Sequence, residues 1–355
     1  MPQLTTTRDL AKKLGLSHST VAMCLRNDPR VAAKTRERVL KCARENGYRP
    51  NPLVDALMAQ VRGKRRQKDT GEVVAFLTAS ESADAWKNLF SASRQFEGAS
   101  SRGKQLGFSV QPFWLGNRGT RCRALDRVLT ARGISGLLLA PLPIDYRTLE
   151  LSWERYALIA MGYSFSQLAP HRVVHHNLKT MFTCYHQLRL LGHRRIGLVL
   201  QPEADERVLH LWSTAFLGAQ RLYQGDRLEP CWIPTLTDPA PFLSWYKRRR
   251  PDAVIGIWNH EPLAWLRAAG IDVPGEVSFA SLDLGEENIG RIAGVLQDNR
   301  NVGIAAMDVL ASVLLQNEVG LPLIPRVTMI EDTWLDGPTV TRRDKTPRRR
   351  RITAS

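Results

Sequence analysis

The chain has 355 residues, of which 43% are hydrophobic and 24% charged, a composition that excludes a disordered protein and suits two or three folded units. No apolar stretch approaches the roughly 18 residues that a membrane span needs, which excludes an integral membrane protein. The formal net charge of +16 lies at the ends, +10 in residues 1–70 and +6 in residues 342–351, which indicates a polyanionic partner for those ends.

Residues 1–49 are predicted to form three short helices. Thr6 and Asp9 have the spacing of a capping box at the start of the first helix, and Ser17 is a suitable N-cap for the second. The third helix is expected at about residues 33–46. A helix, a glycine-containing turn and a short second helix with small polar residues at its start are typical of a helix-turn-helix, whose second helix enters the major groove of DNA.

Helical periodicity divides the second helix into two sides. The apolar side contains Val21, Cys24 and Leu25, which we expect to pack against the other helices. The opposite side, free to contact a partner, contains His18, Ser19, Ala22, Met23 and Arg26. A small three-helix bundle with a solvated basic face is the alternative that this pattern leaves open.

Residues 50–70 are predicted to form a short hinge helix and a basic linker. Asn51 is placed to cap the helix, and Pro52 occupies its first position. The helix is too short to be stable alone in water, so we expect it to need a partner. The stretch from Arg62 to Lys68 is polar and basic, as in a linker.

A specific resemblance covers residues 5–61. Its runs are Thr6-x-x-Asp9-x-Ala11-x-x-x-Gly15-x-Ser17-x-x-Thr20-Val21, then Val31-x-x-Lys34-Thr35-Arg36-Glu37-Arg38-Val39, then Gly47-Tyr48-Arg49-Pro50-Asn51. In order, spacing and residue type, these runs resemble the headpiece of the lactose-repressor (LacI/GalR) family of bacterial transcription regulators.

The resemblance implies DNA contacts residue by residue. His18, Ser19 and Met23 occupy the base-reading positions, and Leu57 matches the leucine that the family's hinge helix wedges into the minor groove, which unstacks and bends the duplex. Phosphate contacts, which position the protein without reading sequence, are implied for Thr6, Ser17, Thr20, Arg26, Thr35 and Asn51. Many relatives carry Arg at the position of Met23, which cannot make a bidentate bond with guanine, so the operator sequence should differ from theirs.

Residues 71–341 carry no net charge and alternate short β-rich runs with amphipathic stretches, which indicates a parallel α/β architecture. Strands are predicted at 73–77, 136–140, 157–161, 196–200, 253–258, 277–282 and 327–332. Helices are predicted at 89–106, 180–191, 212–223, 262–269 and 302–316.

Several runs in this region resemble the same family's effector domain, a two-lobed fold shared with periplasmic sugar-binding proteins. They are Ile134–Pro141, Leu191–Gly197, Arg250–Ile255 and Ala269–Ser278. The resemblance implies an N-lobe of about 71–165 and 298–322 and a C-lobe of about 166–297 and 323–341. It also implies a ligand in the cleft between the lobes, beside three chain crossings near 163–170, 296–300 and 320–326.

The resemblance also implies effector-binding residues, namely His176, His210, Trp258, Asn259, His260 and Asp283. Asn259 and Asp283 match pocket positions of the family, whereas the three histidines stand at or near positions where relatives carry Asp or Arg. Trp258 is a candidate aromatic platform, with core packing as the alternative. Such a pocket has fewer hydroxyl acceptors and more stacking surface than those of the relatives.

We find no catalytic constellation in the sequence. Five of the eight histidines lie between residues 171 and 193, a cluster that could bind zinc or nickel, but His175 and His176 would point to opposite faces of a strand. His260-Glu261 begins like a zincin motif, but Ala264 occupies the position of the second histidine. We therefore predict no enzyme, no metal site and no cofactor.

Residues 342–355 form a basic block that we expect to be a disordered, solvated tail, with added non-specific DNA affinity as the alternative.

The whole chain is expected to be a homodimeric regulator that represses transcription. It would bind a palindromic double-stranded DNA operator, because one headpiece reads only a half-site. The controlling small molecule would be a sugar or sugar derivative.

The scattered cysteines without a C-x-x-C motif and the N-terminus without an apolar signal core favour a cytoplasmic location.

Two rival functions remain open. One is a DNA-binding regulator whose cleft has lost small-molecule control, and the other is a ligand-binding or transport receptor.

Overall fold

The computed structural model describes residues 7–25, 31–46, 72–116, 121–143, 149–224, 227–257 and 261–343. The chain divides into two compact units, Met1–Gln67 and Lys68–Ser355. Among the described residues, no helix combines the length and the apolar composition needed to cross a bilayer.

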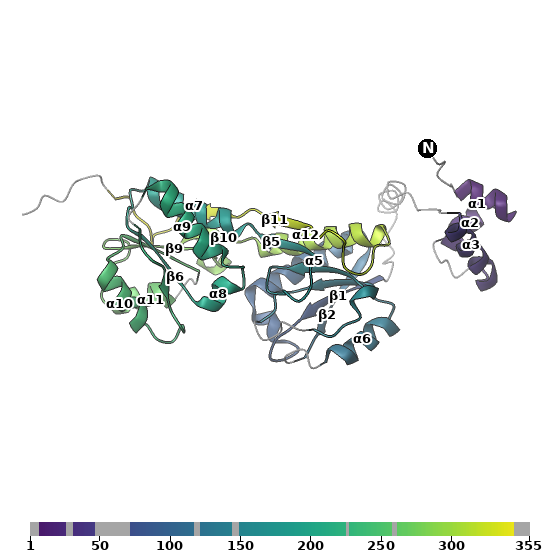
Figure 1. Cartoon of the computed structure of the whole chain (residues 1–355), viewed down its shortest axis with the longest axis horizontal. Coiled ribbons are helices and arrows are strands. Elements are labelled where there is room, and N and C mark those ends of the chain that lie inside the picture. Colours follow the sequence, from purple (N-terminus) through teal and green to yellow (C-terminus); the bar gives the residue numbers. More distant parts are fainter. Residues whose placement is uncertain are drawn as a thin grey trace, which may run out of the picture. The chain divides into compact units, whose positions relative to one another are not determined.

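The first unit contains three helices in its described part, α1 (Thr7–Leu14), α2 (His18–Leu25) and α3 (Ala33–Glu45) (Figure 1). Their apolar sides meet in a small core in which Leu10, Val21, Cys24 and Val39 are fully buried. The predicted packing side of the second helix is confirmed, because Val21 and Cys24 belong to this core. The three-helix arrangement expected from the capping and periodicity signals is therefore present.

The second unit contains two β-sheets, each the centre of one lobe. The first-lobe sheet is wholly parallel and has the strand order β11-β5-β4-β3-β1-β2. The strands are β11 (Val327–Ile330), β5 (His171–His175), β4 (Ala157–Met161), β3 (Gly136–Leu139), β1 (Glu72–Thr78) and β2 (Phe108–Trp114). Continuous apolar runs such as 136–139 are fully buried because helices cover both faces of the sheet.

The second-lobe sheet has the order β12-β10-β9-β8-β6-β7, and only β12, which pairs with β10, runs antiparallel. The strands are β12 (Thr333–Leu335), β10 (Ala293–Leu296), β9 (Ser278–Ser281), β8 (Ala253–Gly256), β6 (Ile196–Leu200) and β7 (Cys231–Trp232). The predicted two-lobed α/β fold with parallel sheets is confirmed.

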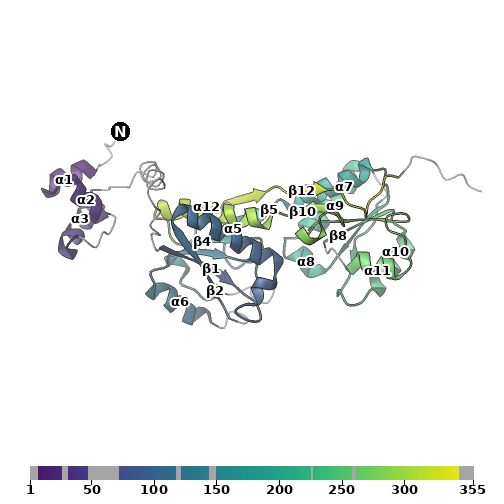
Figure 2. The same ribbon diagram turned by 180° about the vertical axis from the view of Figure 1, so that it is seen from behind.

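Helices cover both faces of each sheet. In the first lobe, α6 (Cys122–Ala131) packs on one face, and α5 (Phe90–Leu106) and α12 (Asn299–Leu315) pack side by side on the other (Figure 2). In the second lobe, one face carries α7 (Asn177–Leu190) and α9 (Leu211–Tyr223), and the other carries α10 (Ala240–Arg249) and α11 (Glu261–Ala268). A short helix, α8 (Pro202–Glu206), and the 3-10 turns Ala85–Asn88, Trp153–Arg155 and Glu286–Asn288 complete the described elements.

The predicted lobe boundaries are wrong at two of the three chain crossings. β5 pairs with β4 and β11 pairs with β5, so both strands belong to the first lobe rather than to the second. The chain therefore crosses between β5 and α7, between β10 and α12, and between β11 and β12. The strand His171–His175 was missed because its ends are polar, and the first crossing was consequently expected several residues too early.

Candidate functional site

The exposed side of α2 begins with two hydroxyl groups. Ser17 Oγ accepts a hydrogen bond from the Thr20 backbone N–H at 3.1 Å and lies 2.7 Å from Thr20 Oγ1. Ser17 is exposed, and Thr20, Met23 and Thr35 are half-buried, so each is accessible at the surface of the headpiece. Hydroxyl groups at the start of a helix suit contact with a phosphate oxygen.

The remaining predicted DNA contacts cannot be placed in this way. His18 and Ser19 lie in the first turn of α2. Thr6, Arg26, Asn51 and Leu57 lie outside the described residues.

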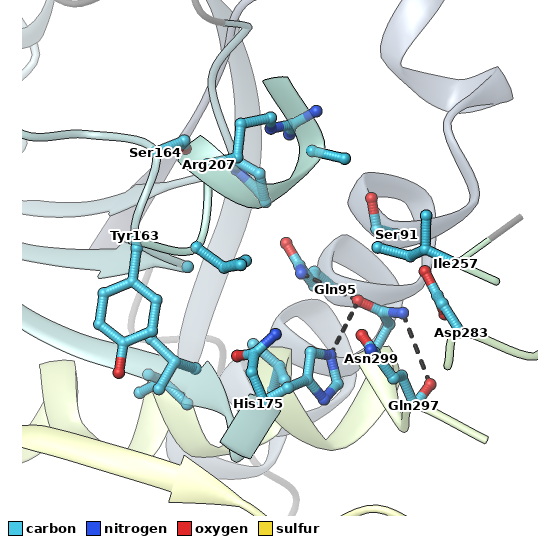
Figure 3. Close-up of a pocket in the computed structure, with 18 of the residues that line it drawn as sticks. Ser91, Gln95, Tyr163, Ser164, His175, Arg207, Ile257, Asp283, Gln297 and Asn299 are labelled. Carbon is cyan, nitrogen blue, oxygen red and sulfur yellow. Dashed lines mark hydrogen bonds between the residues drawn. The ribbon is translucent and has the colours of Figure 1, made fainter. Parts of the chain in front are cut away.

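A cavity of about 290 Å³ lies where the two lobes meet (Figure 3). The first lobe contributes Gln95 of α5 and His175 at the end of β5, and the second lobe contributes Arg207, Trp212 and Asp283. Asn299, at the start of α12, lies at the second crossing and also lines the cavity. The cavity therefore contains polar and charged groups from both lobes and from the connection between them.

His175 joins this cavity to two of the crossings. Its Nδ1 lies 2.9 Å from Asp332 Oδ1, and its Nε2 lies 3.3 Å from Asn299 Oδ1. Asn299 Oδ1 also accepts a hydrogen bond from Gln95 Nε2 at 3.1 Å, and Thr180 Oγ1 donates to Asp332 Oδ2 at 2.6 Å. Because both partners of the imidazole are acceptors, these contacts favour the doubly protonated imidazolium form of His175.

The surroundings of His175 agree with that charge. Burial by itself would lower the pKa of His175, but the hydrogen bond and charge of Asp332, with Asn299 and Asp283, raise it above the ordinary value. Asp332 is only 1% exposed, so the pair is shielded from solvent. The protonated imidazole and this carboxylate therefore neutralise each other beside the cavity, which His175 lines.

Asp283 and Arg207 are two further ionisable groups of the cavity. Burial, assisted by the carboxylates of Asp332 and Glu287 and opposed by His175, raises the pKa of Asp283 to about 6. Desolvation lowers the pKa of Arg207. In Figure 3, Arg207 lies on the opposite side of the cavity from His175, Asn299 and Gln297.

We expect the stability of the ligand-free protein to depend on Asp283 between pH 4 and pH 7. Because the folded pKa of about 6 exceeds the unfolded value, the contribution of this carboxyl is full below about pH 4 and is lost as the pH rises through 6. Asp283→Asn should therefore become more stable relative to the parent at pH 7.5 than at pH 5. Urea unfolding at the two pH values measures the difference in free energy of unfolding between variant and parent. For the exposed control Glu203→Gln, this difference should be the same at both pH values. The same result for Asp283→Asn would contradict the burial argument.

Two predicted effector residues do not line the cavity. His176 caps α7 instead, and its Nδ1 accepts a hydrogen bond from the Lys179 backbone N–H at 3.3 Å. The side chain of His210 is 65% exposed and lies 3.2 Å from Asp205 Oδ2. Asp283 does line the cavity, and Trp258, Asn259 and His260 lie outside the described residues.

The cavity includes residues that sequence reasoning missed. His175 faces it instead of His176 because β5 ends at His175 and α7 begins directly after His176, a difference of one residue that periodicity could not resolve. Arg207 and Trp212 flank His210, the residue placed near the family's clamping arginine, so the right segment was identified but not the right side chains. Among the described residues, no group of His, Cys, Asp and Glu is arranged to hold a metal ion.

Comparison with known sequences matches two parts of the chain. Residues 6–51 match the family described as bacterial regulatory proteins, lacI family, and residues 185–330 match the periplasmic binding protein-like domain. Over 50 residues the chain is 54% identical to the HTH-type transcriptional regulator AglR of Rhizobium meliloti, an alignment that covers 14% of each chain. The chain spans about half the length of the other curated relatives that it matches.

Solved structures match nearly the whole chain. A lac repressor dimer bound to operator and the anti-inducer ONPF is 19% identical, with a TM-score of 0.58 over 96% of this chain and 100% of that one. The transcriptional regulator CelR in complex with cellobiose is also 19% identical, with a TM-score of 0.56 over 94% and 99% of the two chains. The headpiece therefore matches the lacI family of bacterial regulatory proteins over residues 6–51, and the second unit has the two-lobed fold of the solved regulators.

Proposed function

We propose that the protein is a sequence-specific DNA-binding transcriptional repressor that binds a palindromic operator as a homodimer. The observation that carries the proposal is the presence, in one chain, of a helix-turn-helix headpiece with an accessible polar side and a two-lobed domain with a polar cavity. The likeness to a lac repressor dimer bound to operator supports this proposal. Because the partner is DNA, the proposal includes a cytoplasmic location. It includes no catalytic step.

A small molecule in the cavity between the lobes controls DNA binding in this proposal. A ligand can change operator affinity only through its different affinities for two conformations of the domain. The cavity is suited to that role because its lining comes from both lobes and from the chain crossings. A sugar or sugar derivative is the proposed class, supported by the polar side chains set among the apolar ones of the lining and by the likeness to a regulator in complex with cellobiose.

The DNA-binding residues proposed for this chain are those of the headpiece and hinge. His18, Ser19 and Met23 would read bases, and Leu57 would act as the minor-groove wedge. Phosphate contacts would come from Thr6, Ser17, Thr20, Arg26, Thr35 and Asn51.

Operator binding should depend strongly on Leu57. After an operator has been selected from a DNA library with the full chain, Leu57→Ala should weaken binding by about ten- to hundredfold and reduce the bend, because the unstacking wedge is lost. Fluorescence anisotropy and a bending assay measure the two effects. The control Leu323→Ala, at a side chain 98% exposed in the second unit, should leave both unchanged. Undiminished affinity and bending in Leu57→Ala would refute the wedge.

The two rival functions lead to different results. A regulator whose cavity has lost small-molecule control would bind the operator but show no thermal shift with any sugar, nucleoside or amino acid of a broad panel. A transport receptor would bind a ligand but select no DNA sequence. The headpiece counts against the receptor, and a cavity with polar groups from both lobes counts against the loss of control.

A further inference from the structure

Arg207 is a cation in the cavity to which the described residues offer no counterion. It directly follows α8 and lines the cavity, and its guanidinium forms no ion pair or hydrogen bond with another described residue. The nearby buried carboxylate, Asp205, is occupied elsewhere. It accepts hydrogen bonds from the Ser213 backbone N–H at 3.0 Å and from Ser213 Oγ at 2.6 Å, and it lies 3.2 Å from His210 Nδ1.

Asp283, the carboxyl that lines the cavity, does not serve Arg207 either. Its pKa is influenced by burial, His175, Asp332 and Glu287, and Arg207 is not among these influences. Desolvation is the sole influence found on the pKa of Arg207, with no carboxylate acting against it. Arg207 also remains accessible to solvent. An accessible guanidinium without an anion partner is a ready site for an anionic group, because the fork of N–H donors matches carboxylate and phosphate oxygens.

Two further groups of the lining have unused hydrogen-bonding capacity. Gln95 is 3% exposed, and its Oε1 lacks a donor among the described residues, although its Nε2 bonds Asn299. Trp212 is 1% exposed, and its indole Nε1 lacks an acceptor there. One of these atoms needs a donor and the other an acceptor, and a hydroxyl group supplies both.

The volume limits the size of the occupant. A cavity of about 290 Å³ has room for one sugar ring with its substituents. The cation lies on the opposite side from the amides and the imidazolium, so the two ends of a ligand would meet different chemistry.

We propose that the effector is a small hydroxylated acid, whose carboxylate or phosphate group binds Arg207 and whose hydroxyl groups bind Gln95, Trp212 and Asp283. This inference rests on the proposed function, because it names the ligand class of the same cavity. It separates this chain from a regulator of neutral sugars by one charged contact.

Calorimetry on the full chain without DNA tests the ligand class. The probes are glucose, galactose and ribose, and each sugar is compared with the corresponding sugar acid and with the sugar that carries a phosphate on its terminal hydroxyl. At least one acid should bind about tenfold or more tightly than its neutral parent. Arg207→Gln should weaken the binding of that acid by about 10- to 100-fold, because only the charge-assisted contact is lost. The affinity for the neutral parent sugar should change by no more than about twofold. The carboxylate and phosphate series identify which anion the site prefers.

Matched variants make the result specific. Arg207→Lys keeps the charge but loses the fork, so it should restore part of the preference for the acid. Arg221→Gln, at an exposed arginine of α9 outside the cavity, should change nothing. The proposal is overturned if neutral sugars bind as tightly as the acids, if Arg207→Gln keeps the preference, or if no acid of the panel binds.

Operator binding is measured separately. If an acid binds through Arg207 but leaves operator affinity unchanged, the ligand class stands and the control of DNA binding fails. If a neutral sugar releases the operator and the acids do not, the control stands and the ligand class fails.

Discussion

Gly303→Ala is expected to destabilise the second unit by about 3 kcal/mol, even though alanine is the better helix former. Gly303 lies where α12 crosses α5, and a Cβ there would overlap the Gln95 carbonyl oxygen and lie 2.8 Å from its carbon and 2.9 Å from the Ala99 nitrogen. These are backbone atoms, so the clash cannot be relieved by a side-chain rotation. Gly98 makes the reciprocal approach to the Arg300 carbonyl.

Gly218→Ala is the matched control for this prediction. It makes the same substitution in a helix, α9, but a Cβ there would lie 3.6 Å from Phe182 Cζ, an ordinary contact. Its effect should range from neutral to a gain of about 1 kcal/mol. Urea unfolding of the two variants measures the difference. Equal stabilities would contradict the close helix crossing.

The same clash should weaken ligand binding. Gln95, whose backbone oxygen would be displaced, also lines the cavity and bonds Asn299. A shift of α5 away from α12 would therefore move a cavity wall as well as lower stability. The neighbouring chain crossing, which leads into α12, would be moved with it.

His175→Ala should cost about 3 kcal/mol near pH 6, because it leaves the buried carboxylate of Asp332 without its cation. The effect should depend on pH. The folded pKa of His175 is raised, so its contribution is full below the unfolded value of about 6.5 and is lost as the pH rises through the higher folded value. The difference in unfolding free energy between parent and variant should therefore shrink at alkaline pH.

His210→Ala is the control for that experiment. It removes the same residue type from a contact with Asp205, but the side chain is 65% exposed, so the loss should stay below about 1 kcal/mol. Denaturant unfolding at pH 6 and pH 9 compares the two variants. A pH-independent loss in His175→Ala would show that the side chain acts through packing rather than through its charge.

The headpiece was predictable because its signals are local. Ser17 caps α2 through the Thr20 backbone N–H, and Val21 and Cys24 form the buried side, as spacing alone indicated. Buried apolar strands such as β4 were placed for the same reason, since continuous apolar runs in a parallel sheet need no knowledge of their neighbours. Short or polar strands were not found, among them β2, which contains Pro112, and β7, which has two residues.

The cavity depended on tertiary structure. Asn299 and Asp332 each lie more than a hundred residues after His175 in the sequence. The pairing of β11 with β5 brings Asp332 to His175, and the packing of α12 on the first-lobe sheet brings Asn299 there. That pairing also decided where the chain crosses between the lobes, which no local pattern specifies because register and strand neighbours are non-local.

The sequence by itself therefore determined the resemblance to the LacI family in the headpiece, the basic charge there and the alternation of strands and helices, because these follow from local spacing and composition. Tertiary structure alone decided which histidine faces the cavity and that Arg207 lines it without a counterion. Those properties depend on which side chains from distant segments line the same cavity. The pKa of a group in the cavity is set by these side chains and by burial rather than by its sequence neighbours.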